Sequence, residues 1–120
     1  GWHGGGSTPP PGANFNLKYQ KMKKIYISGR ISGLPYTEAV ERLTAAKAFL
    51  ETLGYEALNP TDNGIDPESS WNDHMVADIR MLLEADSVFM LPDWRDSKGA
   101  RIEHNIALEL QKPIHYCEIE

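Results

Sequence analysis

Residues 87–103 read SVFMLPDWRDSKGARIE, and this stretch decides the fold. Its first part, Ser87–Leu91, is a short apolar run that ends at Pro92, which is typical of a buried strand. A polar loop follows, and from Gly99 the chain has a helical pattern that continues to Gln111. A buried strand followed by a loop and a helix is the repeating unit of an α/β protein, in which ligands bind beyond the carboxyl ends of the strands.

One carboxylate in this last helix lies on the side that the helix is expected to bury. At about 100° per residue, the apolar side chains form an arc that contains Ile102, Ile106, Ala107 and Leu110. Glu103 falls inside this arc. Because buried carboxylates are rare unless a partner or a function retains them, Glu103 is the first candidate for a functional residue.

Strand and helix patterns alternate along the rest of the chain. Strands are predicted at Lys24–Ser28, Tyr55–Leu58, Asp86–Leu91 and Pro113–Cys117. Helices are predicted at Thr37–Leu53, Trp71–Glu84 and Gly99–Gln111, with Gly54 ending the first and Ser69 or Ser70 capping the second. The alternation predicts a three-layer α/β/α sandwich of the flavodoxin or Rossmann-like type, with about four parallel strands in the order 2-1-3-4.

The composition is that of a soluble protein with one domain. The chain has 120 residues, of which 41% are hydrophobic and 24% are charged, enough for one core. It contains no apolar run long enough to cross a membrane and no secretory signal, which predicts a cytoplasmic protein with no membrane partner. The net charge of −5 argues against binding polymeric DNA or RNA, but not against a small nucleotide held by one arginine and a helix N-terminus.

The first 21 residues differ in composition from the rest. They contain the low-complexity segments GWHGGGS and TPPPG, and Met22 then leads directly into the first predicted strand. We therefore predict that residues 1–21 are a flexible tail or a linker foreign to the natural protein, and that residues 22–120 form a single domain. The alternative is a native arm that contacts a neighbouring subunit.

The loop after the first strand, residues 28–35, combines glycines with Arg30. Glycine lets a backbone approach a ligand closely, and the planar guanidinium group of Arg30 matches a phosphate or a carboxylate. The loop lacks the spacing of a dinucleotide-binding fingerprint or a P-loop. A plain turn with a surface arginine explains the pattern equally well.

The second predicted helix carries another carboxylate on its apolar side. Its apolar stripe is formed by five side chains: Trp71, Met75, Ile79, Leu82 and Ala85. Asp78 lies within this stripe and His74 lies close to it, although Asp78 alone could be a cap for loop amides and His74 a hydrogen-bonded edge residue. Asp78 and Glu103 then form a pair on the inward faces of two helices that flank one strand. Such a pair suits glycosyl chemistry, in which one carboxylate attacks an anomeric carbon and the other handles the proton of the leaving group.

Other reactive groups give no competing site. No set of residues has metal-ligand spacing and no cofactor is indicated, while Cys117 lies in an apolar run where a structural thiol is commoner than a nucleophile. Trp71 and Trp94 could stack on a planar base. Trp71 equally fits a position that anchors the start of its helix, and Trp94 a position in a subunit interface.

In these residues the chain resembles the nucleoside 2-deoxyribosyltransferase-like superfamily, and within it a small bacterial and phage branch. The resemblance runs from Met22 to about Tyr116. It rests on four motifs in register: YISG at residues 26–29, Asn59-Pro60, Trp71 with Asp78, and the segment from Asp86 to Trp94 followed by Ser97-x-Gly99-x-x-x-Glu103. The spacing from Ser97 to Glu103 and the eight-residue step from Asp78 to Asp86 are also similar to those of nucleotide N-hydrolases such as 2′-deoxynucleoside 5′-phosphate N-hydrolase.

The resemblance implies cleavage or transfer of the N-glycosidic bond of a (deoxy)nucleoside or nucleoside 5′-monophosphate. It implies that Glu103 is the nucleophile at C1′, that Asp78 assists at the sugar or base, and that Ser97 and Gly99 help to hold a 5′-phosphate. The candidate substrate-binding residues are Tyr26, Ser28, Gly29, Arg30, Asp93, Trp94, Ser97 and Gly99. The chain is shorter than the transferases and lacks an obvious fifth strand. It also lacks the C-terminal segment that the transferases contribute to the site of a neighbouring subunit. These differences count against base transfer more than against hydrolysis.

Two further expectations concern partners and the alternative function. We expect a homodimer or larger homo-oligomer, because apolar side chains such as Leu34 and Trp94 need cover. The alternative to an enzyme is a nucleotide-binding or signalling module that keeps the pocket without chemistry. A phage protein that acts on its host through surface patches is a third, weaker reading.

Overall fold

A sheet of four parallel strands forms the centre of the molecule in the computed structural model, which describes residues 22–118. The strands are β1 (Lys24–Ser28), β2 (Glu56–Leu58), β3 (Ser87–Met90) and β4 (Ile114–Tyr116). Three helices connect them, α1 (Tyr36–Thr52), α2 (Trp71–Glu84) and α3 (Lys98–Glu109), together with the short 3-10 turns η2 (Pro60–Asp62) and η3 (Trp94–Asp96). The strand order is β2-β1-β3-β4, which confirms the predicted fold. The prediction for residues 1–21 lies outside the described residues.

The helix boundaries follow from local capping. Ser70 accepts a hydrogen bond from the Asp73 N–H at 3.1 Å and starts α2, which confirms one of the two predicted caps. Ser97 caps α3 in the same way through the Ala100 N–H at 3.2 Å, so α3 begins one residue earlier than predicted. Gly54 lies just beyond α1 with a φ of +92°, a conformation that favours glycine and ends the helix as expected.

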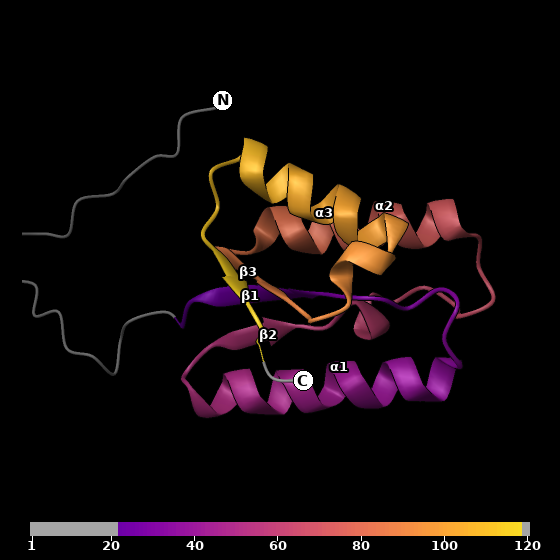
Figure 1. The fold of residues 1–120 in the computed structure, drawn as a ribbon, viewed down its shortest axis with the longest axis horizontal. Helices are drawn as coiled ribbons and strands as arrows, with labels where there is room; N and C mark the ends of the chain where they lie inside the picture. Colours follow the sequence, from indigo (N-terminus) through magenta and orange to yellow (C-terminus); the bar gives the residue numbers. More distant parts are fainter. Residues whose placement is uncertain (1–21, 119–120) are drawn as a thin grey trace, which may run out of the picture.

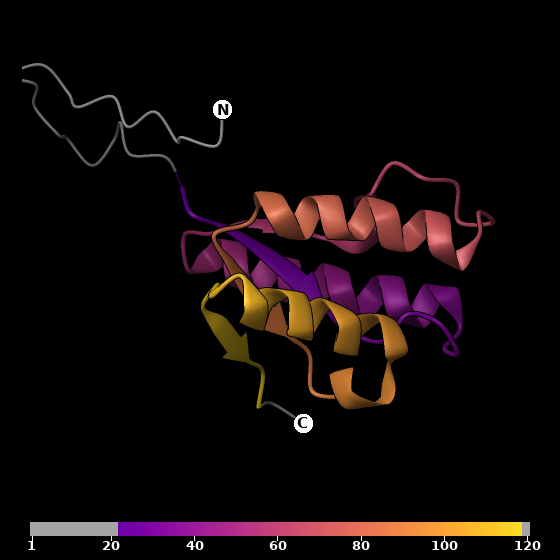
Figure 2. The ribbon, with the colours of Figure 1, turned by 90° about the horizontal axis from the view of Figure 1, so that it is seen from above.

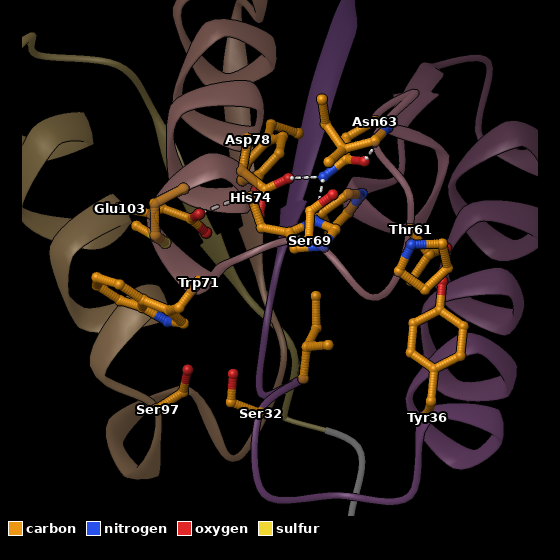
Figure 3. A pocket seen from close by; sticks show the side chains of 17 residues that line it. Ser32, Tyr36, Thr61, Asn63, Ser69, Trp71, His74, Asp78, Ser97 and Glu103 are labelled. Carbon is orange, nitrogen blue, oxygen red and sulfur yellow. Dashed lines mark hydrogen bonds between the residues drawn. The ribbon is translucent and has the colours of Figure 1, made fainter.

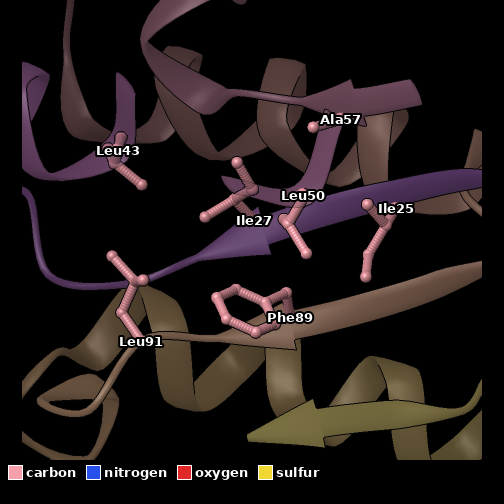
Figure 4. Packing of buried hydrophobic residues seen from close by; sticks show 7 residues of the cluster. All are labelled: Ile25, Ile27, Leu43, Leu50, Ala57, Phe89 and Leu91. Atoms are coloured by element: carbon pink, nitrogen blue, oxygen red, sulfur yellow. The ribbon is translucent and has the colours of Figure 1, made fainter. Parts of the chain in front are cut away.

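The two faces of the sheet are covered by different helices. α1 covers one face, while α2 and α3 lie side by side on the other, as Figures 1 and 2 show. Because side chains alternate along a strand, β1 sends Ile25 and Ile27 toward α1 and Tyr26 toward α2 and α3. The α1 side is packed by seven buried apolar residues (Figure 4): Ile25, Ile27, Leu43, Leu50, Ala57, Phe89 and Leu91.

The predictions for α3 and for the end of α1 need correction. In α3 the buried residues are Ala100, Glu103 and Ala107, whereas Leu110 of the predicted arc is 48% exposed. The buried line of α3 is therefore rotated from the predicted arc, and Glu103 lies at its centre. Leu53, included in the predicted helix, follows the last turn of α1 and is 59% exposed, whereas Leu50, three residues earlier, is buried in the core.

None of the helices within residues 22–118 is long and apolar enough to cross a membrane. The expected homo-oligomer stays a prediction.

Leu43 and Leu53 provide a matched test of the α1 side. Leu43 is fully buried between α1 and the sheet, so Leu43→Ala removes packed methyl groups and leaves a cavity. We expect its free energy of unfolding, measured by urea denaturation, to fall by about 2–5 kcal/mol. Leu53→Ala, at an exposed position of the same segment, is expected to change it by less than about 0.5 kcal/mol. Equal losses in the two variants would contradict the assignment of this core.

Candidate active site

A cavity of about 220 Å³ opens beside the carboxyl ends of the strands (Figure 3). Its walls come from β1 and the loop after it, the start of α1, the long loop after β2, the first half of α2 and the N-terminal part of α3 with the residue before it. Glu103 and Asp78, the two predicted catalytic residues, both line it. The cavity therefore lies where parallel α/β sheets commonly bind ligands, and both predicted carboxylates face it.

Glu103 is held in place by two hydroxyl groups from β1. Its Oε1 accepts a hydrogen bond from Ser28 Oγ at 2.7 Å, and its Oε2 accepts one from Tyr26 Oη at 3.0 Å. Tyr26 and Ser28 are two residues apart, so the alternation of the strand places both on the face that α3 covers. All three side chains are buried, and the carboxylate of Glu103 is consequently fixed in one orientation.

The environment of Glu103 favours its protonated form. Burial raises the pKa of Glu103 to about 8; the hydrogen bond from Ser28 lowers it, the charge of Asp78 raises it, and the hydrogen bond from Tyr26 lowers it. Burial and the two nearby carboxylates also raise the pKa of Tyr26 well above its ordinary value. Tyr26 therefore keeps its proton and acts as a hydrogen-bond donor to Glu103.

Asp78 is the second buried carboxylate of the cavity, with 6% of its surface exposed. Its Oδ1 accepts a hydrogen bond from Asn63 Nδ2 at 2.8 Å. Burial raises the pKa of Asp78 to about 6, against the lowering effects of the Asn63 hydrogen bond and of His74. The two carboxylates of one cavity thus have pKa values that lie apart, which is a common arrangement in acid–base catalysis.

The predicted substrate-binding residues divide into two groups. Tyr26, Ser97 and Gly99 line the cavity, and Ser28 contacts it through Glu103. The Ser97 hydroxyl also caps α3, so this residue fixes the start of the helix that carries Glu103.

The other predicted residues do not line the cavity. Gly29 lies against Leu91, where an added Cβ would be 2.6 Å from the Leu91 Cδ1, so the glycine permits a close approach of two chain segments. Arg30 extends along its own loop, with Nη2 3.5 Å from the Gly33 carbonyl oxygen.

Asp93 and Trp94 have partners outside the cavity. Asp93 Oδ2 forms an ion pair with Arg42 Nη1 at 2.7 Å; partial burial opposes ionisation of Asp93, but Arg42 outweighs it and lowers the pKa. Trp94 stacks on His104, with ring centroids 4.1 Å apart, and Arg95 lies over its indole ring.

Asn63 and His74 complete the site from the side of the long loop. Sequence reasoning did not single out Asn63, which precedes Gly64 in a turn-rich segment where an asparagine ordinarily only shapes the turn. His74 was weighed as an edge residue, yet it lines the cavity one turn before Asp78. Within residues 22–118 no group of three or more His, Cys, Asp or Glu side chains is placed to hold a metal ion.

The raised pKa of Glu103 predicts a pH-dependent loss of stability. Between pH 6 and pH 8 the folded chain holds a proton on Glu103 that the unfolded chain releases, so this group makes the folded state less stable as the pH rises. Glu103 is expected to lower the unfolding free energy of the wild type by roughly 2–3 kcal/mol between pH 6 and pH 8, as measured by urea denaturation. Glu103→Gln should lack this part of the decrease.

Glu109→Gln is the matched control, because Glu109 is exposed on the same helix. It should keep the wild-type dependence of stability on pH. If Glu103→Gln also keeps that dependence, Glu103 does not titrate as its burial requires.

Comparison with solved structures supports the fold found here. A 2-deoxyribosyltransferase from the psychrotolerant bacterium Bacillus psychrosaccharolyticus, described as a biocatalyst for the synthesis of antiviral and antitumoral nucleosides, matches with a TM-score of 0.60. The two sequences are 21% identical, and the match covers 78% of this chain and 70% of the other. A comparison with curated proteins finds no match. The model of one family matches residues 23–116, nearly all of the described chain, and the chain therefore belongs to the family described as domain of unknown function DUF4406.

Proposed function

We propose that this protein cleaves or transfers the N-glycosidic bond of a (deoxy)nucleoside or nucleoside 5′-monophosphate, with Glu103 as the nucleophile. The observation that carries the proposal is a buried carboxylate, held by Tyr26 and Ser28, that faces a cavity beside a second buried carboxylate, Asp78. The likeness of the fold to a 2-deoxyribosyltransferase supports the same class of reaction.

The first step forms an ester between Glu103 and the sugar. A carboxylate oxygen of Glu103 attacks C1′, the bond between C1′ and the base nitrogen breaks, and the bonding electron pair leaves with the base. Asp78 donates its proton to the departing base, directly or through water, or else orients the base. Its pKa of about 6 lets Asp78 carry a proton in part of the population near neutral pH.

The second step releases the sugar. A water molecule attacks C1′, the ester bond breaks, and Glu103 recovers its carboxylate while the proton of the water returns to Asp78. In a transfer reaction, the nitrogen of a second base attacks C1′ in place of water. Tyr26 and Ser28 stay bonded to Glu103 throughout, which favours the ionised form of the nucleophile.

The 5′ end of the sugar is assigned to the N-terminal part of α3. Ser97 and Gly99 line the cavity there, and the positive end of the helix dipole attracts an oxygen or a phosphate. Among the described residues that line the cavity none is a lysine or an arginine, and Arg30 would have to turn away from Gly33 to enter it. This charge distribution favours an uncharged nucleoside over a monophosphate.

Release of free base tests the reaction. The wild-type chain is incubated with a panel of ribo- and deoxynucleosides and their 5′-monophosphates, and free base is measured by chromatography. We expect Glu103→Ala and Glu103→Gln to lower the rate by at least about a thousandfold, because both lack a nucleophilic oxygen anion. Glu109→Gln should retain the wild-type rate.

Two outcomes contradict the proposal. Full activity in Glu103→Ala would exclude Glu103 as the nucleophile. Binding of these compounds in calorimetry without any release of base would instead favour a nucleotide-binding module.

The pH dependence tests the roles of the two carboxylates. The reactive form has Glu103 ionised and a proton on Asp78, so the pair must hold one proton in total. We expect kcat/KM to follow a bell-shaped curve that rises near pH 6 and falls near pH 8, and these two pKa values belong to the pair as a whole. A profile that only rises, with its limb near pH 8, would make Asp78 an orienting residue. Activity that does not fall toward low pH would contradict the role of Glu103.

A further inference from the structure

The amide group of Asn63 joins the two polar residues that α2 presents to the cavity. Its Nδ2 donates to Asp78 Oδ1 at 2.8 Å and lies 3.1 Å from His74 Nδ1. Its Oδ1 accepts a hydrogen bond from the Ile65 N–H at 3.0 Å. Because a backbone N–H can only donate, this last contact determines which end of the amide is oxygen and which is nitrogen.

The orientation of Asn63 selects one form of His74. An amide nitrogen carries two hydrogens and no acceptor, so Nδ2 donates one hydrogen to Asp78 and the other to His74 Nδ1. Nδ1 must then be the unprotonated nitrogen of the ring. The hydrogen of the neutral imidazole consequently lies on Nε2.

This leaves a hydrogen-bond donor at the cavity. His74 is half-buried and lines the cavity one helical turn before Asp78, as Figure 3 shows. Within residues 22–118, the hydrogen bonds of its ring involve only Nδ1. The Nε2–H group is therefore the polar group that His74 can offer to a bound molecule.

We propose that His74, held by Asn63 with its hydrogen on Nε2, determines specificity by donating a hydrogen bond to an acceptor atom of the leaving base. The inference rests on the proposed function and adds to it a recognition group for the base. Purines carry an acceptor, N3, and pyrimidines a carbonyl oxygen, O2, two bonds from the glycosidic nitrogen. A base bound in the cavity would meet His74 and Asp78 on the same side, because both side chains line it from α2.

Within this network, Asn63 has a different role from His74. Asn63 contacts neither Glu103 nor a reacting atom, so it is a positioning residue that acts through His74 and Asp78. The titratable side chains that line the cavity with Asn63 are Tyr26, Tyr36, His74, Asp78 and Glu103. Both experiments that test the role of His74 are therefore carried out at a single pH.

The first experiment observes the ring directly and needs no activity. The full chain is labelled with ¹⁵N-histidine, and the His74 signals are assigned by their loss in His74→Phe. We expect the Nε2–H form at pH 7.5 in the wild type, a mixture of both neutral forms in Asn63→Ala, and a shift of the Nε2 signal on addition of free adenine. An Nδ1–H form in the wild type, or no shift with adenine or cytosine, would overturn the inference.

The second experiment uses the reaction. His74→Phe keeps the ring volume without a donor, whereas Gln at this position can place an amide N–H close to the former Nε2. We expect roughly a 3- to 10-fold loss of kcat/KM in His74→Phe, as for one hydrogen bond, and a substantial recovery in His74→Gln. For the wild type, a purine nucleoside whose N3 is replaced by CH should have a kcat/KM that is lower by the same factor. For His74→Phe, the two nucleosides should have equal kcat/KM values. His115→Phe, on exposed β4, is the control and should behave as the wild type.

The two proposals fail in different ways. If His74→Phe and the N3-deficient substrate react as readily as their parents while Glu103→Ala is inactive, only the role of His74 is wrong. If no base is released by any chain, yet adenine shifts the Nε2 signal, the glycosidic reaction is wrong and His74 is a base-binding residue of a non-catalytic pocket.

Discussion

One buried carboxylate lies at the centre of the polar network between the sheet and α3. Glu103 lies under α3 against the sheet, where water cannot solvate its charge, and only the hydroxyl groups of Tyr26 and Ser28 compensate. Burying a carboxylate costs free energy that an apolar side chain at the same position would not cost. That expense is the physical reason for treating Glu103 as functional, independently of any relative.

Three features of the fold place Glu103 and its partners. The alternation of β1 brings two hydroxyl groups to one face, parallel pairing of β1 with β3 aligns their carboxyl ends, and the cap at Ser97 sets where α3 begins. Asp78 reaches the same cavity because α2 and α3 cover the same face of the sheet. Ordinary α/β geometry is thus sufficient to assemble two carboxylates from distant parts of the chain.

Much of this arrangement was accessible from the sequence. Periodicity predicts the seven main elements, and an acidic residue on an apolar face is visible without a structure, as Glu103 and Asp78 illustrate. The rotation of the buried face of α3 was not accessible, because it depends on how closely the small residues Ala100 and Ala107 approach the sheet. The contribution of Asn63 was also hidden, since its partner His74 lies eleven residues further on and only the path of the loop brings them together.

The division of the sheet into two unlike faces has a consequence for how the protein can change. The α1 face is packed by aliphatic and aromatic side chains, while the hydroxyl groups and carboxylates lie on the α2–α3 face. Each side also has its own cluster of seven buried apolar residues, and none of the seven on the α1 side lines the cavity. Substitutions in the cavity wall can therefore change the substrate while the α1 side keeps its part of the folding energy.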